Sequence, residues 1–376
     1  MGKVAYIISC SDHYNVRLHV FDKYLKDNGY SVNYITSDFD HNSKEFFTCS
    51  VNGSIQIHAK PYKKNISFAR IFSHKFFAKA VYKYLLKLEN KPDVIVMHIP
   101  PNFLAHYAAK FKKKYPKTKL IFDIFDLWPE TFPSNKQKKL LAPAFKVWGS
   151  LRDRSFKYAD FIISECDLFR EKLKLKDDLS GTLYLCGKEL KLDSSVKIDE
   201  SKIELCYVGA INNLISISSI CKLISGLVKE KQVILHVIGK GEKTEKLLNS
   251  VKSTGAEVVY YGPIYDDEKK NEIIRRCMFG LNIMKDAVCV GLTMKSIEYF
   301  RYGLPIINNI PADTRNMVLN EGVGVELDGD CVQKILKMNV SDCVAMRGNV
   351  KNLFKNKFTE EDIYNKLDLF IGEMVK

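Results

Sequence analysis

Several common sequence signals are missing from this chain of 376 residues, and each absence narrows the class of protein. None of its ten cysteines stands in a Cys-x-x-Cys pair, and most lie inside apolar segments. That pattern indicates buried, reduced thiols rather than disulfides or a zinc site. No apolar run reaches about twenty residues, so we expect no transmembrane helix. No segment resembles a signal peptide, which favours a cytoplasmic globular protein.

Motifs of nucleotide-hydrolysing and nucleic-acid-binding proteins are missing as well. The chain has no Gly-x-x-x-x-Gly-Lys-Ser/Thr P-loop. It also has no helix-turn-helix, zinc pattern or RNP-like aromatic motif. The net charge of +14 could suggest a nucleic-acid partner by itself. Without a supporting motif this remains the weakest alternative, and we expect no nucleic acid to bind.

The positive charge is confined to one part of the chain. Residues 51–150 contain 19 lysines and arginines against 5 acidic residues, whereas the remainder is balanced. Four lysines recur at four-residue spacing and would form one stripe on a helix: Lys75, Lys79, Lys83 and Lys87. A second basic cluster follows at 110–119. We interpret the aromatic residues beside the stripe as an inward-packing face, and we expect the lysines to meet an anionic partner such as a membrane surface.

Strand-like and helix-like segments alternate along most of the chain, which predicts an α/β fold with two Rossmann-like domains. We expect the first domain at 1–187, a polar linker at 188–202 and the second domain at 203–358. An amphipathic C-terminal helix at 359–376 could pack back on the first domain. Ligands of doubly wound sheets bind at the carboxyl ends of strands. We therefore expect the site in a cleft between the two domains.

Loops that follow strands of the second domain carry the candidate ligand-binding residues. Three of them begin with a glycine, which permits positive φ and close approach of a ligand to the backbone. A fourth leads into "TMKSIEYFRYGLPII" (293–307), which predicts a short helix that ends at a glycine. Its first turn would offer N–H groups to a pyrophosphate, with Lys295 adding positive charge. Glu298 could accept hydrogen bonds from two ribose hydroxyls, or form an ordinary surface pair with Lys295.

These segments together resemble a known family. The run "YVG", "VIGKGEK", "YYGPI" and "KSIEYFRYGLPII" is similar to the donor-binding domain of GT-B fold glycosyltransferases of the family 4 type. "KPDVIVMHIPP" and "IFDIFDLWPET" resemble blocks in the first domain of bacterial polysaccharide and O-antigen transferases. The resemblance implies two Rossmann-like domains facing a cleft, an acceptor-binding first domain and a nucleotide-sugar donor, with a UDP-sugar as the first candidate.

The resemblance also implies roles for individual residues of the second domain. Glu298 would bind the ribose and Lys295 would lie by the diphosphate. The other implied donor-site residues are Gly209, Ala210, Asn212, Gly239, Lys240, Leu292 and Thr293, with Pro263 and Ile264 beside the base. Two positions depart from the family pattern. Val290 stands where a second glutamate is often found, and the first loop reads "AINNLIS", without the basic residues that are often present there.

Three residues of the first domain are catalytic candidates: Asp126, Glu130 and His98. An aspartate at a strand end could orient or deprotonate an acceptor hydroxyl, and Asp126 matches a position that holds a histidine in many family members. The alternative for Asp126 is a helix cap before Pro129. A lone histidine such as His98 is more often structural than catalytic.

These observations predict a glycosyltransferase that moves a sugar from a nucleotide donor to a growing, lipid-linked cell-surface glycan, such as a capsule or O-antigen, at the inner face of the membrane. The family implies retaining chemistry. A sugar-nucleotide epimerase of the same fold is the alternative, and it would not need the basic helix. We expect no metal and no Asp-x-Asp pair at a strand end, because helix N–H groups and Lys295 could neutralise the leaving diphosphate.

Overall fold

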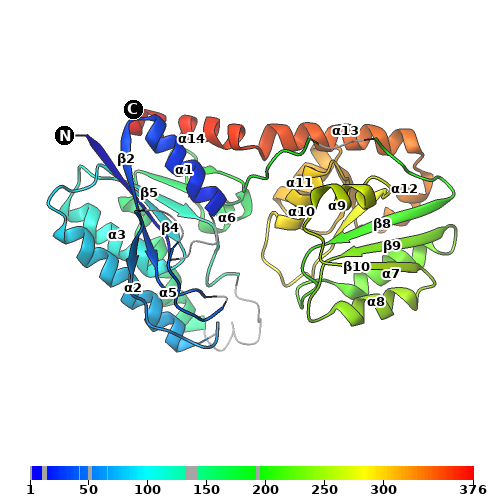
Figure 1. Ribbon diagram of the computed structural model, residues 1–376, viewed down its shortest axis with the longest axis horizontal. Helices are drawn as coiled ribbons and strands as arrows, with labels where there is room; N and C mark the ends of the chain where they lie inside the picture. The colour runs from blue at the N-terminus through cyan, green and yellow to red at the C-terminus, as the bar shows by residue number, and fades with distance from the viewer. Residues whose placement is uncertain are drawn as a thin grey trace. The chain divides into compact units, whose positions relative to one another are not determined.

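The computed structural model describes residues 2–10, 15–41, 43–49, 53–65, 67–131, 142–191 and 195–376. The chain divides into two compact units, which are shown in Figure 1. Unit 1 comprises Met1–Leu185 together with Ile363–Lys376, and unit 2 comprises Cys186–Asp362. Among the described residues no helix is long and apolar enough to span a membrane.

Unit 1 is built on a sheet of seven parallel strands. The strands are β1 (Lys3–Ile8), β2 (Tyr30–Ser37), β3 (Ile55–Ile57), β4 (Val94–Ile99), β5 (Lys119–Ile124), β6 (Phe161–Ser164) and β7 (Ser180–Thr182). Their order in the sheet is β3-β2-β1-β4-β5-β6-β7. The strand order reverses between β1 and β4. At such a switch point the loops diverge, and doubly wound sheets bind their ligands there.

Helices cover both faces of this sheet. They are α1 (Asn15–Asp27), α2 (Phe68–Lys87), α3 (Asn102–Lys114), α5 (Ala142–Asp153), α6 (Asp167–Leu173) and α14 (Glu360–Val375). Helices α2, α3 and α5 pack together on one face, and α1 lies beside α14 on the other (Figure 1). Every residue of β4 is buried, as expected for a parallel strand with helices above and below.

Helix α14 is tied to unit 1 by side-chain contacts far apart in sequence. The Tyr24 hydroxyl donates to Asp368 Oδ1 at 3.0 Å. Phe370 stacks on Phe161, with the ring centroids 5.4 Å apart. The same ring occupies the space beside Gly181, where an added Cβ would lie 2.5 Å from it. The chain therefore returns to unit 1 after it has completed unit 2.

Unit 2 has a sheet of six parallel strands. They are β8 (Lys202–Val208), β9 (Gln232–Ile238), β10 (Glu257–Gly262), β11 (Phe279–Asn282), β12 (Ile306–Asn308) and β13 (Gly324–Glu326). The order is β10-β9-β8-β11-β12-β13, so the switch point lies between β8 and β11. The helices are α7 (Ile217–Leu227), α8 (Thr244–Lys252), α9 (Asp267–Ile274), α10 (Met294–Arg301), α11 (Asp313–Glu321), α12 (Cys331–Lys337) and α13 (Val340–Lys357).

The prediction of an α/β chain with two Rossmann-like parts is confirmed by these two parallel sheets. The predicted linker at 188–202 falls within unit 2, and Lys202 already begins β8. Residues 192–194 of that segment lie outside the described residues.

The surface of α2 differs from the prediction in one respect. The lysines of the predicted stripe are all exposed: Lys75, Lys79, Lys83 and Lys87. The expectation that the aromatic residues beside them pack inward is wrong for Phe72 and Phe76, which are 63% and 41% exposed. Phe68, one turn earlier, is 70% exposed. Four-residue spacing puts these three on one stripe, whereas Phe77 and Val81 occupy the buried face.

Candidate functional site

A buried polar network anchors the N-terminus of α10. Thr293 caps the helix by accepting a hydrogen bond from Ser296 N at 3.0 Å, and its hydroxyl donates to Asn282 Oδ1 at 2.9 Å. The Asn282 amide donates to Asn308 Oδ1 at 2.8 Å, and the Asn308 amide donates to Glu326 Oε1 at 2.7 Å. Both asparagines are fully buried at the ends of β11 and β12. Their contacts fix where the first N–H groups of α10 lie.

Tyr299 fixes the rotation of α10 against the sheet. Its hydroxyl accepts a hydrogen bond from Val208 N at 2.9 Å and lies 3.2 Å from the Leu281 carbonyl, so it joins β8 to β11. Gly280 makes room for the ring, because a Cβ there would lie 2.6 Å from it. With Tyr299 held on the inner face, Lys295 remains half-buried on another side of the helix.

Lys295 lies at the switch point of unit 2. Its Nζ donates to the Tyr207 hydroxyl at 2.8 Å and sits 4.0 Å from the centroid of that ring. A Cβ added to Gly209 would be 3.9 Å from the Lys295 Cε, so this side chain lies beside the loop that follows β8. Desolvation lowers the pKa of Lys295 to about 7. Among the described residues no carboxylate pairs with it, which leaves its charge available to a ligand.

Glu298 does not pair with Lys295. Its Oε1 lies 2.6 Å from Lys270 Nζ, and its Oε2 lies 3.5 Å from Arg301 Nη1. Arg301 also binds Asp267 at 2.8 Å, so the carboxylate belongs to a network that links α9 and α10. Glu298 keeps a quarter of its side chain exposed. Since each carboxylate oxygen can accept more than one hydrogen bond, the network leaves acceptor capacity on Glu298.

Contacts between neighbouring loops account for two glycines of unit 2. A Cβ on Gly239 would lie 2.0 Å from the Gly209 carbonyl oxygen. A Cβ on Gly241 would lie 2.3 Å from the Ile211 carbonyl oxygen. At both positions the close passage of another loop is by itself a reason for glycine. Gly209 has a φ of +113°, and among the described residues a Cβ added to it would meet only the Lys295 side chain within 4 Å.

The remaining predicted donor-site residues have less specific surroundings. Ala210, Lys240 and Pro263 are exposed, Ile264 is half-buried and Leu292 is buried. Asn212 closes a local turn, because its Oδ1 accepts from Leu214 N at 2.9 Å. The structure thus groups Gly209, Thr293 and Lys295 around the start of α10.

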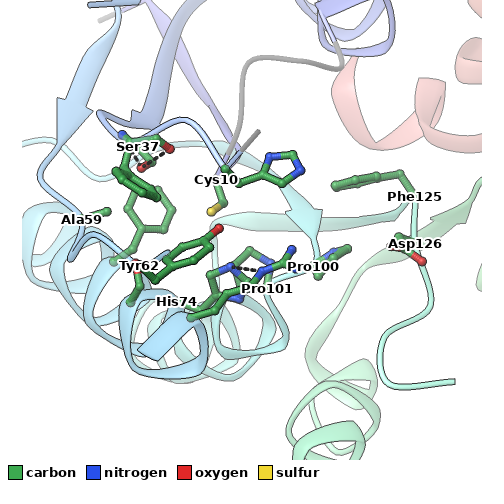
Figure 2. A pocket seen from close by; sticks show the side chains of 14 residues that line it. Cys10, Ser37, Ala59, Tyr62, His74, Pro100, Pro101, Phe125 and Asp126 are labelled. Atoms are coloured by element: carbon green, nitrogen blue, oxygen red, sulfur yellow. Dashed lines mark hydrogen bonds between the residues drawn. The ribbon is translucent and has the colours of Figure 1, made fainter. Parts of the chain in front are cut away.

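Asp126 lines a cavity at the strand ends of unit 1. The cavity has a volume of about 90 Å³, and Figure 2 shows Tyr62 and His74 on one side of it and Phe125 and Asp126 on the other. Asp126 Oδ1 accepts hydrogen bonds from Leu127 N and from the Thr131 hydroxyl, both at 2.7 Å. Burial raises the pKa of this carboxyl group. Asp126 is therefore held by its own turn and still faces the cavity.

Glu130 and His98 have structural contacts. Glu130 binds the buried Arg152 through both oxygens, at 3.0 and 2.7 Å. His98 is fully buried, with its Nδ1 2.7 Å from Asp123 Oδ2. Asp123 also accepts from Arg17 Nε at 2.9 and 2.8 Å, so these three side chains form a cluster inside unit 1. The Arg17 guanidinium holds the pKa of Asp123 well below its usual range, against the opposing effect of burial.

Arg70 also lines the cavity of unit 1, and the sequence analysis did not select it. Its guanidinium lies 5.9 Å from the ring centroid of Tyr62 and 5.2 Å from that of Trp128. The sequence does contain a feature that could have identified this residue, because Arg70 is the single arginine in the basic segment 51–150. Arginine suits planar recognition of oxyanions in a way that lysine does not.

One expectation about acidic pairs is wrong. Asp38 and Asp40 form an Asp-x-Asp sequence directly after β2. Asp38 is engaged locally, because it accepts from Ala59 N at 2.9 Å and lies 2.8 Å from His58 Nδ1. Within the described ranges no group of three or more His, Cys, Asp or Glu side chains is placed to hold a metal ion.

The two parallel sheets, each with its own switch point, define an α/β protein of the GT-B fold, and comparison with solved structures agrees. The lipopolysaccharide outer core galactosyltransferase WaaB, in its apo form, has a TM-score of 0.65 at 15% identity, with 99% of each chain covered. HepE of Anabaena, solved with UDP and glucose, has a TM-score of 0.62 at 11% identity, covering 99% of this chain and 100% of that chain. A trehalose-6-phosphate structure from E. coli, bound with UDP-2-fluoro glucose, has a TM-score of 0.65 at 9% identity, covering 100% of this chain and 99% of that chain. Neither a family model nor a curated protein sequence matches the chain.

Proposed function

We propose that this protein is a glycosyltransferase that takes its sugar from a UDP-sugar donor bound by unit 2. The observation that carries the proposal is Lys295, a cation without an acid partner in the described chain, held beside Gly209 and the first turn of α10. Proteins of the same fold have been solved with UDP or a UDP-sugar, which supports the choice of donor.

In this proposal the donor diphosphate lies at the N-terminus of α10. The first N–H groups of the helix and the Lys295 ammonium stabilise the negative charge that develops on the leaving UDP. Glu298 accepts hydrogen bonds from the ribose hydroxyls with the acceptor capacity that Lys270 and Arg301 leave on it. Neutralisation by these groups supports transfer without a bound metal ion.

The acceptor would bind unit 1, with Asp126 beside its reacting hydroxyl. Transfer forms a bond from that oxygen to the anomeric carbon, breaks the bond from this carbon to UDP, and releases the hydroxyl proton. A carboxylate whose pKa is raised by burial is a stronger base, which suits Asp126 to receive this proton. The resemblance to family 4 enzymes supports retention of configuration at the anomeric carbon.

The surface of α2 supports a lipid-linked acceptor at an anionic membrane. Lysines attract anionic lipid headgroups by roughly 1 kcal/mol each when they lie near the surface. The exposed Phe68, Phe72 and Phe76 add an apolar stripe that can enter the headgroup region. A growing cell-surface glycan on a lipid carrier would be presented at such a surface.

Calorimetry with UDP tests the donor site. We expect UDP to bind the wild-type protein, and Lys295→Ala to weaken binding by at least about tenfold, or 1.4 kcal/mol. Lys229→Ala, which removes an exposed lysine elsewhere in unit 2, serves as the matched control. Equal affinities for both variants would contradict the assignment. Conversion of a UDP-sugar to its epimer without an acceptor, followed by NMR, would favour the epimerase alternative.

A further inference from the structure

Arg70 brings a positive charge to the cavity of unit 1 and forms no ion pair in the part of the chain that the structure describes. Its Nε donates to His74 Nε2 at 3.4 Å, and its Nη1 donates to the Asn65 carbonyl at 3.2 Å. The guanidinium also lies over the rings of Tyr62 and Trp128. A guanidinium has five N–H donors in a planar fork. The Tyr62 side chain is a further hydrogen-bonding partner of the guanidinium, and among the described residues no carboxylate engages the donors on Nη2.

His74 also lines the cavity and carries a buried donor without a partner in the described chain. The side chain is only 6% exposed, and its Nε2 accepts the hydrogen bond from Arg70. Burial, and then the charge of Arg70, lower the pKa of His74 to about 3, so the ring is neutral at physiological pH. A neutral ring that accepts through Nε2 carries its proton on Nδ1. That atom has no hydrogen-bond partner in the described chain, which is uncommon for a buried donor.

The cavity is small and lies where ligands of such sheets bind. The volume of the cavity is about 90 Å³. By the same measure one water molecule needs roughly 10–15 Å³, so the cavity admits a group of a few heavy atoms. Its walls include Cys10 after β1, Pro100 after β4 and Asp126 after β5, which places it at the switch point of unit 1 (Figure 2). Asp126 lines the cavity but forms no ion pair with Arg70.

We propose that this cavity binds an oxyanion of the acceptor, either a carboxylate or a phosphoryl group, with Arg70 and His74 as its hydrogen-bond donors. The fork of Arg70 can bind two oxygens of such a group side by side, and His74 Nδ1–H can donate to a further lone pair. That the oxyanion belongs to the acceptor rests on the proposed function. Because Asp126 shares the cavity, the acceptor carries its anionic group close to its reacting hydroxyl.

Inorganic phosphate is the first probe for this site. Its affinity for the full-length protein is measured by calorimetry against chloride at matched ionic strength, so that general screening cancels. We expect Arg70→Gln to weaken phosphate binding by about tenfold or more, and Arg70→Lys to restore part of it, because lysine keeps the charge but loses the fork. Arg154→Gln removes an exposed arginine of unit 1 and should leave the affinity unchanged.

Folding of the variants is followed separately by the tryptophan fluorescence of Trp128 and Trp148, both in unit 1. His74→Phe gives a second variant that keeps a ring in place but removes the Nδ1 donor. Weaker phosphate binding in this folded variant supports the proposal. Phosphate affinities that are the same in wild type, Arg70→Gln, His74→Phe and Arg154→Gln overturn it.

Three further probes separate the two sources of the oxyanion. Glucuronate carries a carboxylate, glucose 1-phosphate carries a phosphoryl group and glucose carries neither. Binding of either anion that depends on Arg70, with no such dependence for glucose, supports the site and identifies the group. UDP binding to Arg70→Gln, which should equal that of wild type, is measured alongside. If UDP binds neither the wild-type protein nor the variants, the donor-site assignment is wrong. If all three probes bind with the same affinity whether or not Arg70 is present, only the proposed anion site is wrong.

Discussion

Each unit holds one cation at its switch point without an acid partner in the described chain, but the two are held in different ways. Arg70 of unit 1 lies over two aromatic rings and donates to His74 and a backbone carbonyl. Lys295 of unit 2 lies on the face of Tyr207, where desolvation lowers its pKa to about 7. A guanidinium stays charged in such surroundings, whereas an ammonium group can lose its proton.

Other charged groups near these sites are neutralised by partners. Asp123 binds Arg17 and lies against His98 in unit 1, and Glu298 binds Lys270 in unit 2. The comparison shows that a charged residue cannot be identified as a ligand-binding residue from its type alone. A charge at a strand end becomes a candidate when its neighbours hold it in place and leave it unneutralised.

The largest expected effect comes from breaking a paired charge. Asp123→Asn leaves Arg17 buried without its counter-charge, and removal of one partner from a buried pair typically costs about 3–5 kcal/mol of unfolding free energy. Urea denaturation followed by tryptophan fluorescence reports on unit 1, which contains both Trp128 and Trp148. Arg70→Gln should lower the free energy of unfolding far less. Equal losses in the two variants would contradict the distinction between paired and unpaired cations.

The next effect concerns the lysines of α2. Replacement of Lys75, Lys79, Lys83 and Lys87 by Gln should release the protein from vesicles rich in anionic lipid, since each lysine near the surface contributes roughly 1 kcal/mol. Binding should also fade as salt shortens the Debye length. Sedimentation with such vesicles measures both effects. If the quadruple variant sediments with the vesicles as wild type does, the four lysines form only a solvated helix face and do not bind the membrane.

Variants of Glu298 and of its neighbour Asp267 test whether Glu298 contacts the ligand or only supports the structure. Glu298→Ala should weaken UDP binding by at least about tenfold, or 1.4 kcal/mol. Asp267→Asn perturbs the other carboxylate of the same network without removing the proposed ribose acceptor. Calorimetry on both variants therefore tests the role of Glu298. If the two lose UDP affinity to the same extent, Glu298 acts through the network alone.

The last effect is the pH dependence of donor binding, which is small close to pH 7 and grows as the pH rises. In the free protein Lys295 is charged below its pKa of about 7 and loses its proton above it. A bound diphosphate favours the charged form, so UDP affinity should be greatest below pH 7. It should fall by up to about tenfold per pH unit above it. Lys295→Arg keeps its charge and should flatten this profile. An identical slope in both proteins would mean that another group titrates.

Much of the fold could be predicted because its long strands and helices have clear patterns. The apolar run of β4 and the helical spacing of α3 are visible in the sequence. The strands β3, β6, β7 and β13 have only three or four residues each, and so short a segment shows no periodicity of its own.

The site could be predicted only in part. Lys295 and Glu298 were found from their place after a strand-end loop, but the partner of Glu298 comes from α9, 28 positions away, and no local pattern reveals it. Glu130 and His98 were chosen because they follow or end a strand, and their partners Arg152 and Asp123 are likewise distant or hidden in the core. The sequence also cannot show that another loop passes close to Gly239.

The return of the chain to unit 1 has a consequence for the order of folding during synthesis. A ribosome completes unit 2, a continuous segment from Cys186 to Asp362, before it makes Ile363–Lys376. Since domains fold as units while the chain emerges, unit 2 can fold while unit 1 still lacks the helix that packs on Tyr24 and Phe161. The half of the protein that is translated first is therefore the half that is finished last.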